Sequence, residues 1–367
     1  MKFMKLLLIA PCPPPYGGIS NWSKIVIDGI RRYFADIDLD VIDISPRRRE
    51  TEGRNLFNRA MDGITSTIKA LCIAKKTLKN SKPDSVHLTT SGSLALLRDY
   101  VLLIFFRKHQ INTVYHIHFG RTAEIIKYGS WERILLMHAM KHAGSVIILD
   151  RLSFNSLREQ FPLLQVKKIN NPIKIMGEPR NSTSKYYMFL GWVLKTKGIE
   201  ELVSAWNQAG INATLRIVGP YQESYLEYLH QAGYDFKSII FEGEKGHDEA
   251  MEILSECEAF ILPSYSEGCP YVILEAMSFK KPIIATNVGD IPNMLSNECG
   301  ILVEPHSSTQ ICEAIKSLES DSDLKIRIGS NAYKRVLEEY SIKEILDLYR
   351  NEWESKYESI PFLLNIS

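Results

Sequence analysis

Short runs of apolar and β-branched residues recur along the chain and alternate with longer stretches whose apolar residues repeat every three or four positions. The short runs are typical of buried strands, and the longer stretches are typical of amphipathic helices. In the first half we expect strands at 5–10, 39–45, 85–90, 113–118 and 145–149, with helices that include 21–33 and 64–79. Regular alternation of this kind predicts an α/β fold with a parallel sheet.

The pattern breaks at Asn170-Asn171-Pro172, which the polar stretch 177–185 follows, and then restarts. Strands are expected at 186–191, 214–219, 238–243, 259–263, 282–286 and 300–303. Helices are expected at 198–208, 223–232, 247–257, 271–279, 309–319, 324–339 and 342–357. We therefore predict two doubly wound, Rossmann-like domains, 1–170 and 171–341, that face each other across a cleft. The last helix, about 342–367, is expected to pack back on the first domain.

The charge distribution changes sign at the same place. Of the 44 Lys and Arg, 26 lie in residues 1–170, against 14 of the 43 Asp and Glu, so a net charge of +1 conceals a basic first half and an acidic second half. Such asymmetry suggests a different partner for each half. The clearest basic clusters are Arg31-Arg32, Arg47-Arg48-Arg49 and Lys75-Lys76.

Composition excludes several classes of protein. At 45% hydrophobic and 24% charged residues the chain is an ordinary globular protein, neither disordered nor collagen-like. The most apolar stretch, 94–106, contains Arg98 and Asp99, and the N-terminus has too short an apolar core for a signal peptide. Six cysteines without regular spacing predict reduced thiols and a cytoplasmic location.

The most informative segment is 264–277, SYSEGCPYVILEAM, directly after a predicted strand. Gly268 and Pro270 predict a tight turn and a first helical position, so that a helix begins near Tyr271. The unpaired N–H groups at a helix start attract an anion. Glu267 and Glu275 flank that position, and carboxylates there suit hydroxyl groups rather than the anion. A ligand with a sugar, a diphosphate and a ribose in line fits Glu267, the helix start and Glu275 in that order. The alternative is that both glutamates are solvated charges at the end of a helix.

The spacing of Glu267 and Glu275 resembles the E-x7-E motif of the retaining nucleotide-sugar glycosyltransferases of family 4, also called glycosyl transferases group 1, which have the two-domain GT-B fold. The stretches FLGWVLKTKG (189–198), LRIVGP (215–220) and KKPIIATNVGDIPNML (280–295) also resemble family motifs. In the last of these, Asp290 stands where the family usually has Gly, and Asn293 where it usually has Glu.

The resemblance implies roles for the second domain. Lys197 would neutralise the donor diphosphate, Glu267 would orient the donor sugar, and Glu275 would bind the ribose. Trp192 replaces a common Arg, for which Lys195 could compensate. The residues implied on the donor side are Gly17, Gly18, Gly191, Lys195, Gly219, Gly243, Gly268, Cys269, Pro270, Tyr271, Val272 and Glu275.

The first domain matches the family more loosely. Gly17-Gly18 follow the first strand in a loop that could approach a phosphate, although on these residues alone an ordinary tight turn is the better interpretation. No acidic residue is expected to end the second strand, so a dinucleotide-binding pattern is not predicted. His116 and His118 alternate onto one face of a strand; a metal pair, a packed pair and a role at the cleft remain open. The resemblance favours His118 as the catalytic histidine near the transferred sugar, with His116 and Arg121 on the acceptor side.

The implied activity is transfer of a hexose from a nucleotide diphosphate sugar to an acceptor hydroxyl, with retention of configuration and without a metal or other cofactor. The implied acceptor is anionic or lipid-linked, as in bacterial surface polysaccharide synthesis. The basic clusters suggest contact with an anionic membrane at its inner face, and no nucleic acid partner is expected. A nucleotide-sugar epimerase of the same fold and a non-catalytic sugar-nucleotide-binding protein are the alternatives.

Overall fold

The computed structural model describes residues 3–14, 17–45, 56–176 and 185–355, without the side chains of 56–64 and 66. The chain divides into two compact units. Unit 1 comprises Met1–Pro172 with Ile342–Ser367, and unit 2 comprises Ile173–Ser341. The division lies two residues beyond the predicted boundary at 170. The basic cluster 47–49, most of the polar stretch 177–185 and the end of the last predicted helix lie outside the described residues.

Unit 1 is built on a six-stranded parallel sheet in the order β2-β1-β3-β4-β5-β6. The strand order reverses between β1 and β3: β2 is added on one side of β1, and β3 to β6 are then added on its other side. The strands are β1 (Met4–Ala10), β2 (Ile37–Asp43), β3 (Ser85–Thr90), β4 (Asn112–Ile117), β5 (Ser145–Ile148) and β6 (Val166–Lys168).

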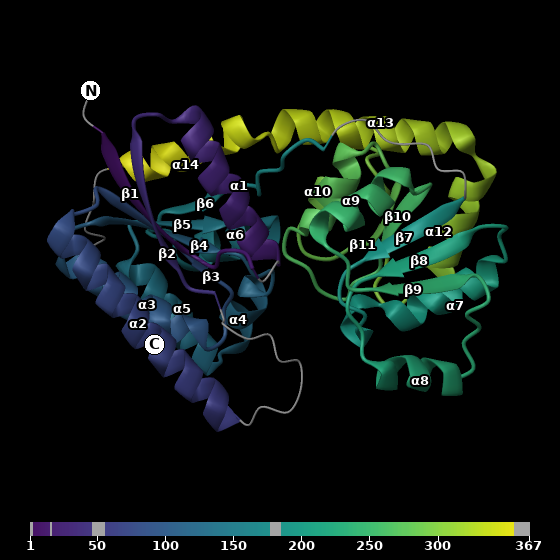
Figure 1. Ribbon diagram of the computed structural model, residues 1–367, viewed down its shortest axis with the longest axis horizontal. Coiled ribbons are helices and arrows are strands. Elements are labelled where there is room, and N and C mark those ends of the chain that lie inside the picture. The colour runs from purple at the N-terminus through teal and green to yellow at the C-terminus, as the bar shows by residue number, and fades with distance from the viewer. Residues whose placement is uncertain (1–2, 15–16, 46–55, 177–184, 356–367) are drawn as a thin grey trace. The chain divides into compact units, whose positions relative to one another are not determined.

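Helices cover both faces of this sheet (Figure 1). One face carries α1 (Gly18–Tyr33) and α14 (Ile342–Glu354), which contact each other, and α14 also contacts β3 and β4. The other face carries α2 (Leu56–Asn80), α3 (Ala95–Lys108), α4 (Thr122–Tyr128), α5 (Trp131–His142) and α6 (Arg151–Gln160). The last helix therefore completes a face that the first helix alone leaves partly open.

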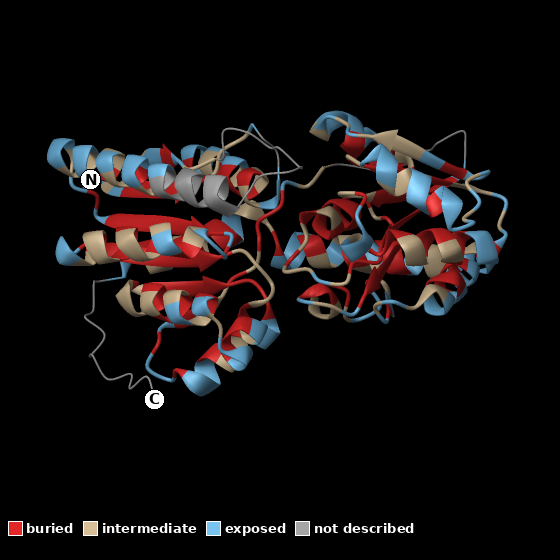
Figure 2. Cartoon of the chain, turned by 90° about the horizontal axis from the view of Figure 1, so that it is seen from below, coloured by how far each residue is buried: buried red, intermediate tan, exposed pale blue. Residues whose placement is uncertain are grey.

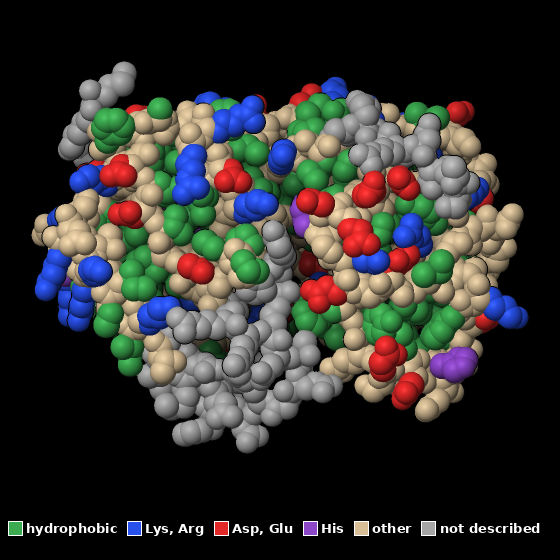
Figure 3. All heavy atoms as spheres, viewed as in Figure 1, with side chains coloured by type: hydrophobic (Ala, Val, Ile, Leu, Met, Phe, Trp, Pro, Cys, Tyr) green, Lys and Arg blue, Asp and Glu red, His purple; other side chains and the backbone are tan. Residues whose placement is uncertain are grey.

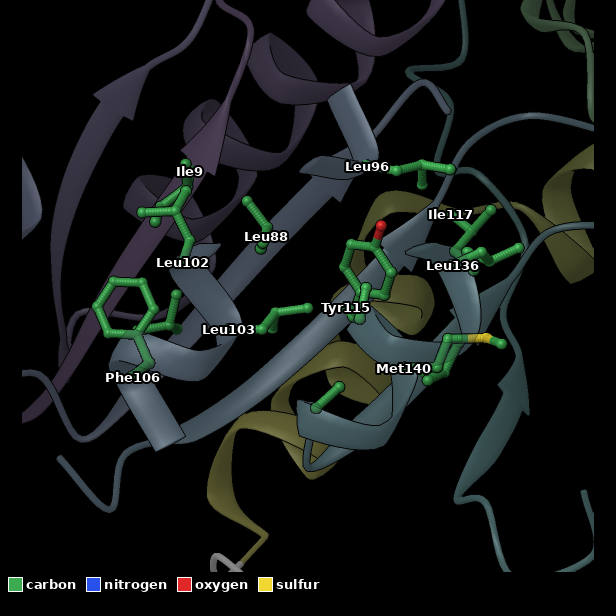
Figure 4. Close-up of a cluster of buried hydrophobic side chains, with 14 of the residues drawn as sticks. Ile9, Leu88, Leu96, Leu102, Leu103, Phe106, Tyr115, Ile117, Leu136 and Met140 are labelled. Atoms are coloured by element: carbon green, nitrogen blue, oxygen red, sulfur yellow. The ribbon is translucent and has the colours of Figure 1, made fainter. Parts of the chain in front are cut away.

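The core of unit 1 lies between the sheet and the second group of helices. Figure 4 shows Ile9 of β1 beside Leu102 of α3, and Ile117 of β4 beside Leu136 of α5. The inner strands of both sheets are buried almost throughout (Figure 2), as expected for a parallel sheet covered on both faces, whereas the edge strands β2, β6, β9 and β12 are partly exposed. Burial of this apolar surface is the main force that holds each unit together.

Unit 2 has a second six-stranded parallel sheet, in the order β12-β11-β10-β7-β8-β9. This is the order of dinucleotide-binding folds, with the reversal between β7 and β10. The strands are β7 (Tyr186–Leu190), β8 (Thr214–Val218), β9 (Ile239–Gly243), β10 (Ala259–Leu262), β11 (Ile283–Thr286) and β12 (Ile301–Val303). The helices are η1 (Lys195–Lys197), α7 (Ile199–Ala209), α8 (Glu223–Gln231), α9 (His247–Glu256), α10 (Tyr271–Ser278), α11 (Ile291–Met294), α12 (Ser308–Ser320) and α13 (Ser322–Glu339).

The predicted α/β fold with two Rossmann-like domains is confirmed, and each predicted strand is present within two residues at either end. The helix expected at 21–33 already begins at Gly18, and the N–H of Asn21 donates to the carbonyl of the N-cap Gly17 over 2.8 Å. The prediction that no acidic residue ends the second strand is wrong. Asp43 ends β2, and its Oδ1 accepts hydrogen bonds from the N–H groups of Cys12 and Ser45.

The charge asymmetry is visible on the surface. On the face shown in Figure 3, Lys and Arg outnumber Asp and Glu over unit 1, and the reverse holds over unit 2. All six cysteines are free thiols, four of them buried. None of the helices in the described part of the chain combines the length and the apolar character that crossing a bilayer requires.

Candidate functional site

In unit 2 the sequence motifs meet where the strand order reverses. The loop after β7 contains Lys197, and the loop after β10 contains Glu267; β7 and β10 are neighbours in the sheet. The N–H of Tyr265 donates to the carbonyl of Thr196 over 3.0 Å and joins the two loops. Open α/β sheets bind ligands at the carboxyl ends of strands at such a reversal.

Lys197 and Glu267 form an ion pair at this point. The Lys197 Nζ lies 2.5 Å from Glu267 Oε1, and their side chains are 27% and 13% exposed. The partly buried position strengthens the attraction relative to a surface pair. The two residues predicted to bind the diphosphate and the sugar are therefore brought together, each within reach of the same bound molecule.

Three predicted donor-side glycines lie side by side along the carboxyl edge of unit 2. The N–H of Gly219 donates to the carbonyl of Gly243 over 2.9 Å. A Cβ on Gly219, which has φ +142°, would lie 1.9 Å from the carbonyl oxygen of Gly191. Only glycine allows the strand ends to approach so closely, and the result is an edge without side chains at these three positions.

Helix α10 begins beside this edge. Pro270 is the N-cap, with φ −71° and ψ 124°, rather than the first helical residue that we predicted; the helix starts at Tyr271. Glu275 is buried at 3% exposure, which excludes a solvated helix-end charge. Cys269 and Tyr271 are also buried, and Val272 is partly exposed. The buried carboxylate favours a built site over ordinary surface charge.

The two departures from the family motif occur together. Asn293 Nδ2 donates to Asp290 Oδ2 over 3.3 Å, and the N–H of Asp290 donates to the carbonyl of Gly268 over 2.9 Å. Asp290 thus links α11 to the loop that carries Glu267.

Trp192 is a third departure from the family motifs, and its side chain is partly exposed. Nearby, Lys195 pairs with Glu200 at 3.5 Å, and 66% of the Lys195 side chain is exposed. Lys195 is therefore more exposed than Lys197, and whether it compensates for the missing Arg stays a prediction.

In unit 1 the reversal lies between β1 and β3, and Gly17-Gly18 stand at the start of α1 after β1. The space where a Gly18 Cβ would lie is open. One turn into α1, the Trp22 ring lies 4.9 Å from the His118 ring, edge to face. The structure thus brings the Gly17-Gly18 helix start and His118 to the same part of unit 1.

His116 and His118 share one face, as the alternation predicts, with ring centroids 3.9 Å apart. His116 is completely buried, so the prediction that it lies on the acceptor side does not fit; it belongs to a packed pair with His87. Burial lowers the pKa of His87 to about 3 and that of His118 to about 3, and it lowers the pKa of His116 as well. All three rings are neutral at physiological pH.

Arg121 lies at the start of α4. Its guanidinium makes two hydrogen bonds to the Glu132 carboxylate, at 2.9 and 3.1 Å, and one to the Ser93 hydroxyl at 2.8 Å. An acceptor contact by Arg121 must therefore compete with Glu132.

Sequence reasoning missed the residues that surround the histidines. These are Trp22 of α1, His87 of β3, and Tyr349 and Trp353 of α14. Tyr349 and Trp353 are four residues apart and so share a helix face, which is the pattern that could have marked α14 as a cover for this sheet.

Two Rossmann-like units in one chain, with this strand order in unit 2, agree with the predicted GT-B fold. Residues 172–335 match the family described as "Glycosyl transferases group 1". Residues 172–335 therefore form a glycosyl transferases group 1 domain, as the sequence motifs of this part of the chain predict, and assignment to family 4 is compatible with this match.

Named relatives agree with this assignment. An uncharacterized glycosyltransferase of Methanocaldococcus jannaschii is 22% identical over 90% of this chain and 93% of its own length. The capsular polysaccharide biosynthesis glycosyltransferase CapM of Staphylococcus aureus is 28% identical over 46% of this chain and 44% of its own.

Solved structures share the fold. Sucrose-phosphate synthase from Thermosynechococcus elongatus superposes with a TM-score of 0.76 at 18% identity, over 95% of this chain and 98% of that one. Anabaena HepE, solved in complex with UDP-glucose, superposes with a TM-score of 0.71 at 18% identity and the same coverage. At such identities the likeness concerns the fold alone.

Proposed function

We propose that this glycosyltransferase transfers a hexose from a nucleotide diphosphate sugar to an acceptor hydroxyl with retention of configuration and without a metal. The observation that carries the proposal is the Lys197–Glu267 ion pair at the strand-order reversal of unit 2, beside the start of α10. When the sugar–phosphate bond breaks, negative charge develops on the leaving nucleoside diphosphate. The Lys197 ammonium and the first N–H groups of α10 are oriented to stabilise that charge.

Glu267 and Glu275 would hold the two ends of the donor. A carboxylate accepts hydrogen bonds from adjacent hydroxyls, so Glu267 suits the sugar and the buried Glu275 suits the ribose. Binding of a diphosphate would draw Lys197 away from Glu267 and leave that carboxylate to the sugar. We assign Glu267 to orientation of the donor and not to nucleophilic attack.

The proposed acceptor is a lipid-linked saccharide in surface polysaccharide synthesis. Relatives named for capsular polysaccharide and O-antigen synthesis support this substrate class. Exposed Arg31, Arg32, Lys75 and Lys76 of unit 1 would favour an anionic membrane surface, at about 1 kcal/mol for each basic residue near it. Flotation with liposomes tests this part; binding that is indifferent to anionic lipid would remove it.

A thermal-shift screen of UDP-, GDP-, ADP- and dTDP-sugars tests the proposed donor class. A donor present at about 100 times its Kd should stabilise the protein by about 2.7 kcal/mol. We expect one nucleotide to raise the Tm of the wild-type protein and to have less effect on Lys197→Ala. If no nucleotide sugar raises the Tm, the proposed function is wrong.

A further inference from the structure

Three histidine rings of unit 1 form one connected cluster beneath α14. His87 comes from β3, and His116 and His118 come from the end of β4. Rings from α1 and α14 enclose them: Trp22 lies 5.2 Å from His87, and Trp353 lies 6.0 Å from it. No carboxylate is hydrogen-bonded to these histidines among the described residues, so the positions of their protons are set by their hydrogen bonds to one another and to Trp353.

The direction of each hydrogen bond follows from the first donor. An indole Nε1–H can only donate, and Trp353 Nε1 lies 2.9 Å from His87 Nδ1. His87 Nδ1 is therefore an acceptor, and the proton of the neutral His87 ring sits on Nε2. His87 Nε2 lies 3.2 Å from His116 Nδ1, so His87 donates and His116 accepts. The proton of the neutral His116 ring must then sit on its own Nε2.

His116, the last residue of this hydrogen-bond relay, lies against His118. The His116 and His118 rings are 3.9 Å apart and tilted by 35°. His116 Nε2 and His118 Nε2 are both buried without a hydrogen-bond partner among the described residues. A buried N–H without a partner is costly, and such groups are retained where they serve a purpose. His118 therefore packs against a ring whose orientation and tautomer are fixed by its hydrogen bond to His87.

Helix α14 supports His118 by a second route. Trp22 packs edge to face on His118, and its indole N–H donates to the Tyr349 hydroxyl over 3.1 Å. Tyr349 of α14 thus holds Trp22 against His118. Trp353, one turn later in α14, determines which nitrogens of His87 and His116 carry a proton.

We propose that Trp353 and His87 are positioning residues for His118: their hydrogen-bond relay fixes the orientation and the Nε2–H tautomer of His116, and the His116 ring in turn holds His118 in place after the carboxyl end of β4. This rests on the proposed function, together with the place near the donor sugar that the family resemblance implies for His118. A neutral imidazole can donate to one sugar oxygen and accept from another, whereas a charged one can only donate.

The tautomer of His116 is measured directly by nitrogen chemical shifts in protein labelled with 15N-histidine. Wild-type protein should show one His116 form, protonated on Nε2. Gln at position 87 keeps a donor near the position of Nε2, and Leu removes it. We expect His87→Gln to preserve the His116 form and His87→Leu to produce a mixture of both forms.

Steady-state kinetics test the effect on His118. Trp353→Phe keeps an aromatic ring but deletes the first donor, and we expect roughly a tenfold loss of kcat or more with little change in the KM of the donor. Trp206→Phe is the matched control, because Trp206 is equally buried and donates its indole N–H to Ser238 in unit 2.

Two results would overturn the inference: a His116 ring that stays in the Nε2–H form in His87→Leu, or a kcat of Trp353→Phe equal to that of Trp206→Phe. If the wild-type protein shows the predicted tautomer but transfers no sugar, the relay stands and the proposed function falls.

Discussion

Lys197 Nζ donates to Glu267 Oε1 over 2.5 Å and thereby joins the two loops that flank the strand-order reversal of unit 2. Once a nucleotide sugar binds, we expect Lys197 to contact its diphosphate and Glu267 to contact its sugar. Most of the predictions below follow from that pair and from the backbone that supports it.

Replacing Lys197 by Ala should remove the cation that stabilises the leaving diphosphate. The loss of one preorganised group of this kind costs about 10²–10³ in kcat. Lys195→Ala is the control, because Lys195 is mostly exposed and pairs with Glu200, and it should reduce kcat only a few-fold. Transfer rates with saturating donor measure both. Equal losses in the two variants would contradict the dominance of Lys197.

Glu267→Gln should separate sugar orientation from diphosphate binding. The amide cannot hold the Lys197 ammonium as an ion pair, so the lysine becomes available to phosphate. We expect the variant to bind a nucleoside diphosphate as tightly as wild type or more tightly, while transfer falls by about two orders of magnitude. Calorimetric titration with the diphosphate gives the first quantity. A covalent glycosyl adduct on Glu267 of the wild-type enzyme, found by mass spectrometry, would instead identify Glu267 as a nucleophile.

Gly289→Ala should disturb the Glu267 loop through the backbone. A Cβ at Gly289 would lie 2.0 Å from the carbonyl oxygen of Glu267, at φ +57°. Gly233 has φ +87°, and no atom lies within contact distance of a Cβ placed there. Gly233→Ala therefore measures the loss of stability from the left-handed backbone conformation without a clash, about 1–2 kcal/mol. Gly289→Ala should lose more stability in urea and should also lose affinity for the donor. Equal stability of the two variants would show that the loop moves freely.

The buried histidines should make unit 1 sensitive to acid. The pKa of folded His87 is about 3, below its ordinary value of 6.5, so the unfolded chain takes up a proton that the folded chain refuses. This contribution to stability is complete above pH 6.5 and is lost as the pH falls toward 3.

Between pH 7 and pH 5, His87 alone should cost about 2 kcal/mol of unfolding free energy. His87→Gln should therefore lose about that much less than wild type over the same interval. Urea denaturation at the two pH values measures the difference. Identical pH dependence of the two proteins would mean that His87 is not neutral and buried.

The fold was largely predictable from the sequence because each buried strand is a short apolar run with a helix after it. The run at 259–263 and the helix after it placed Glu267 and Glu275 correctly. Elements without strong patterns were missed. β6 has only three residues, Val166–Lys168, and the apolar residues of α3 are spread around the helix rather than along one face, because it packs against α5 as well as the sheet.

The site was predictable only where it is contained in one segment. The Lys197–Glu267 pair joins residues 70 positions apart, and the sheet order that brings them together cannot be read from either segment. The histidine cluster depends on α14, more than 220 positions after β4 in the chain, so its neighbours became visible only in the folded unit. The coupled departures Asp290 and Asn293 are three residues apart, yet their hydrogen bond is evident only once α11 is known.

The most direct test of the proposed activity is release of nucleoside diphosphate from the nucleotide sugar that best stabilises the protein, measured with and without a lipid-linked saccharide acceptor. The account predicts rapid release only when both acceptor and wild-type protein are present, with a loss of about 10²-fold or more in Lys197→Ala. Conversion of the donor without any acceptor, or release that is unaffected by Lys197→Ala, would contradict it.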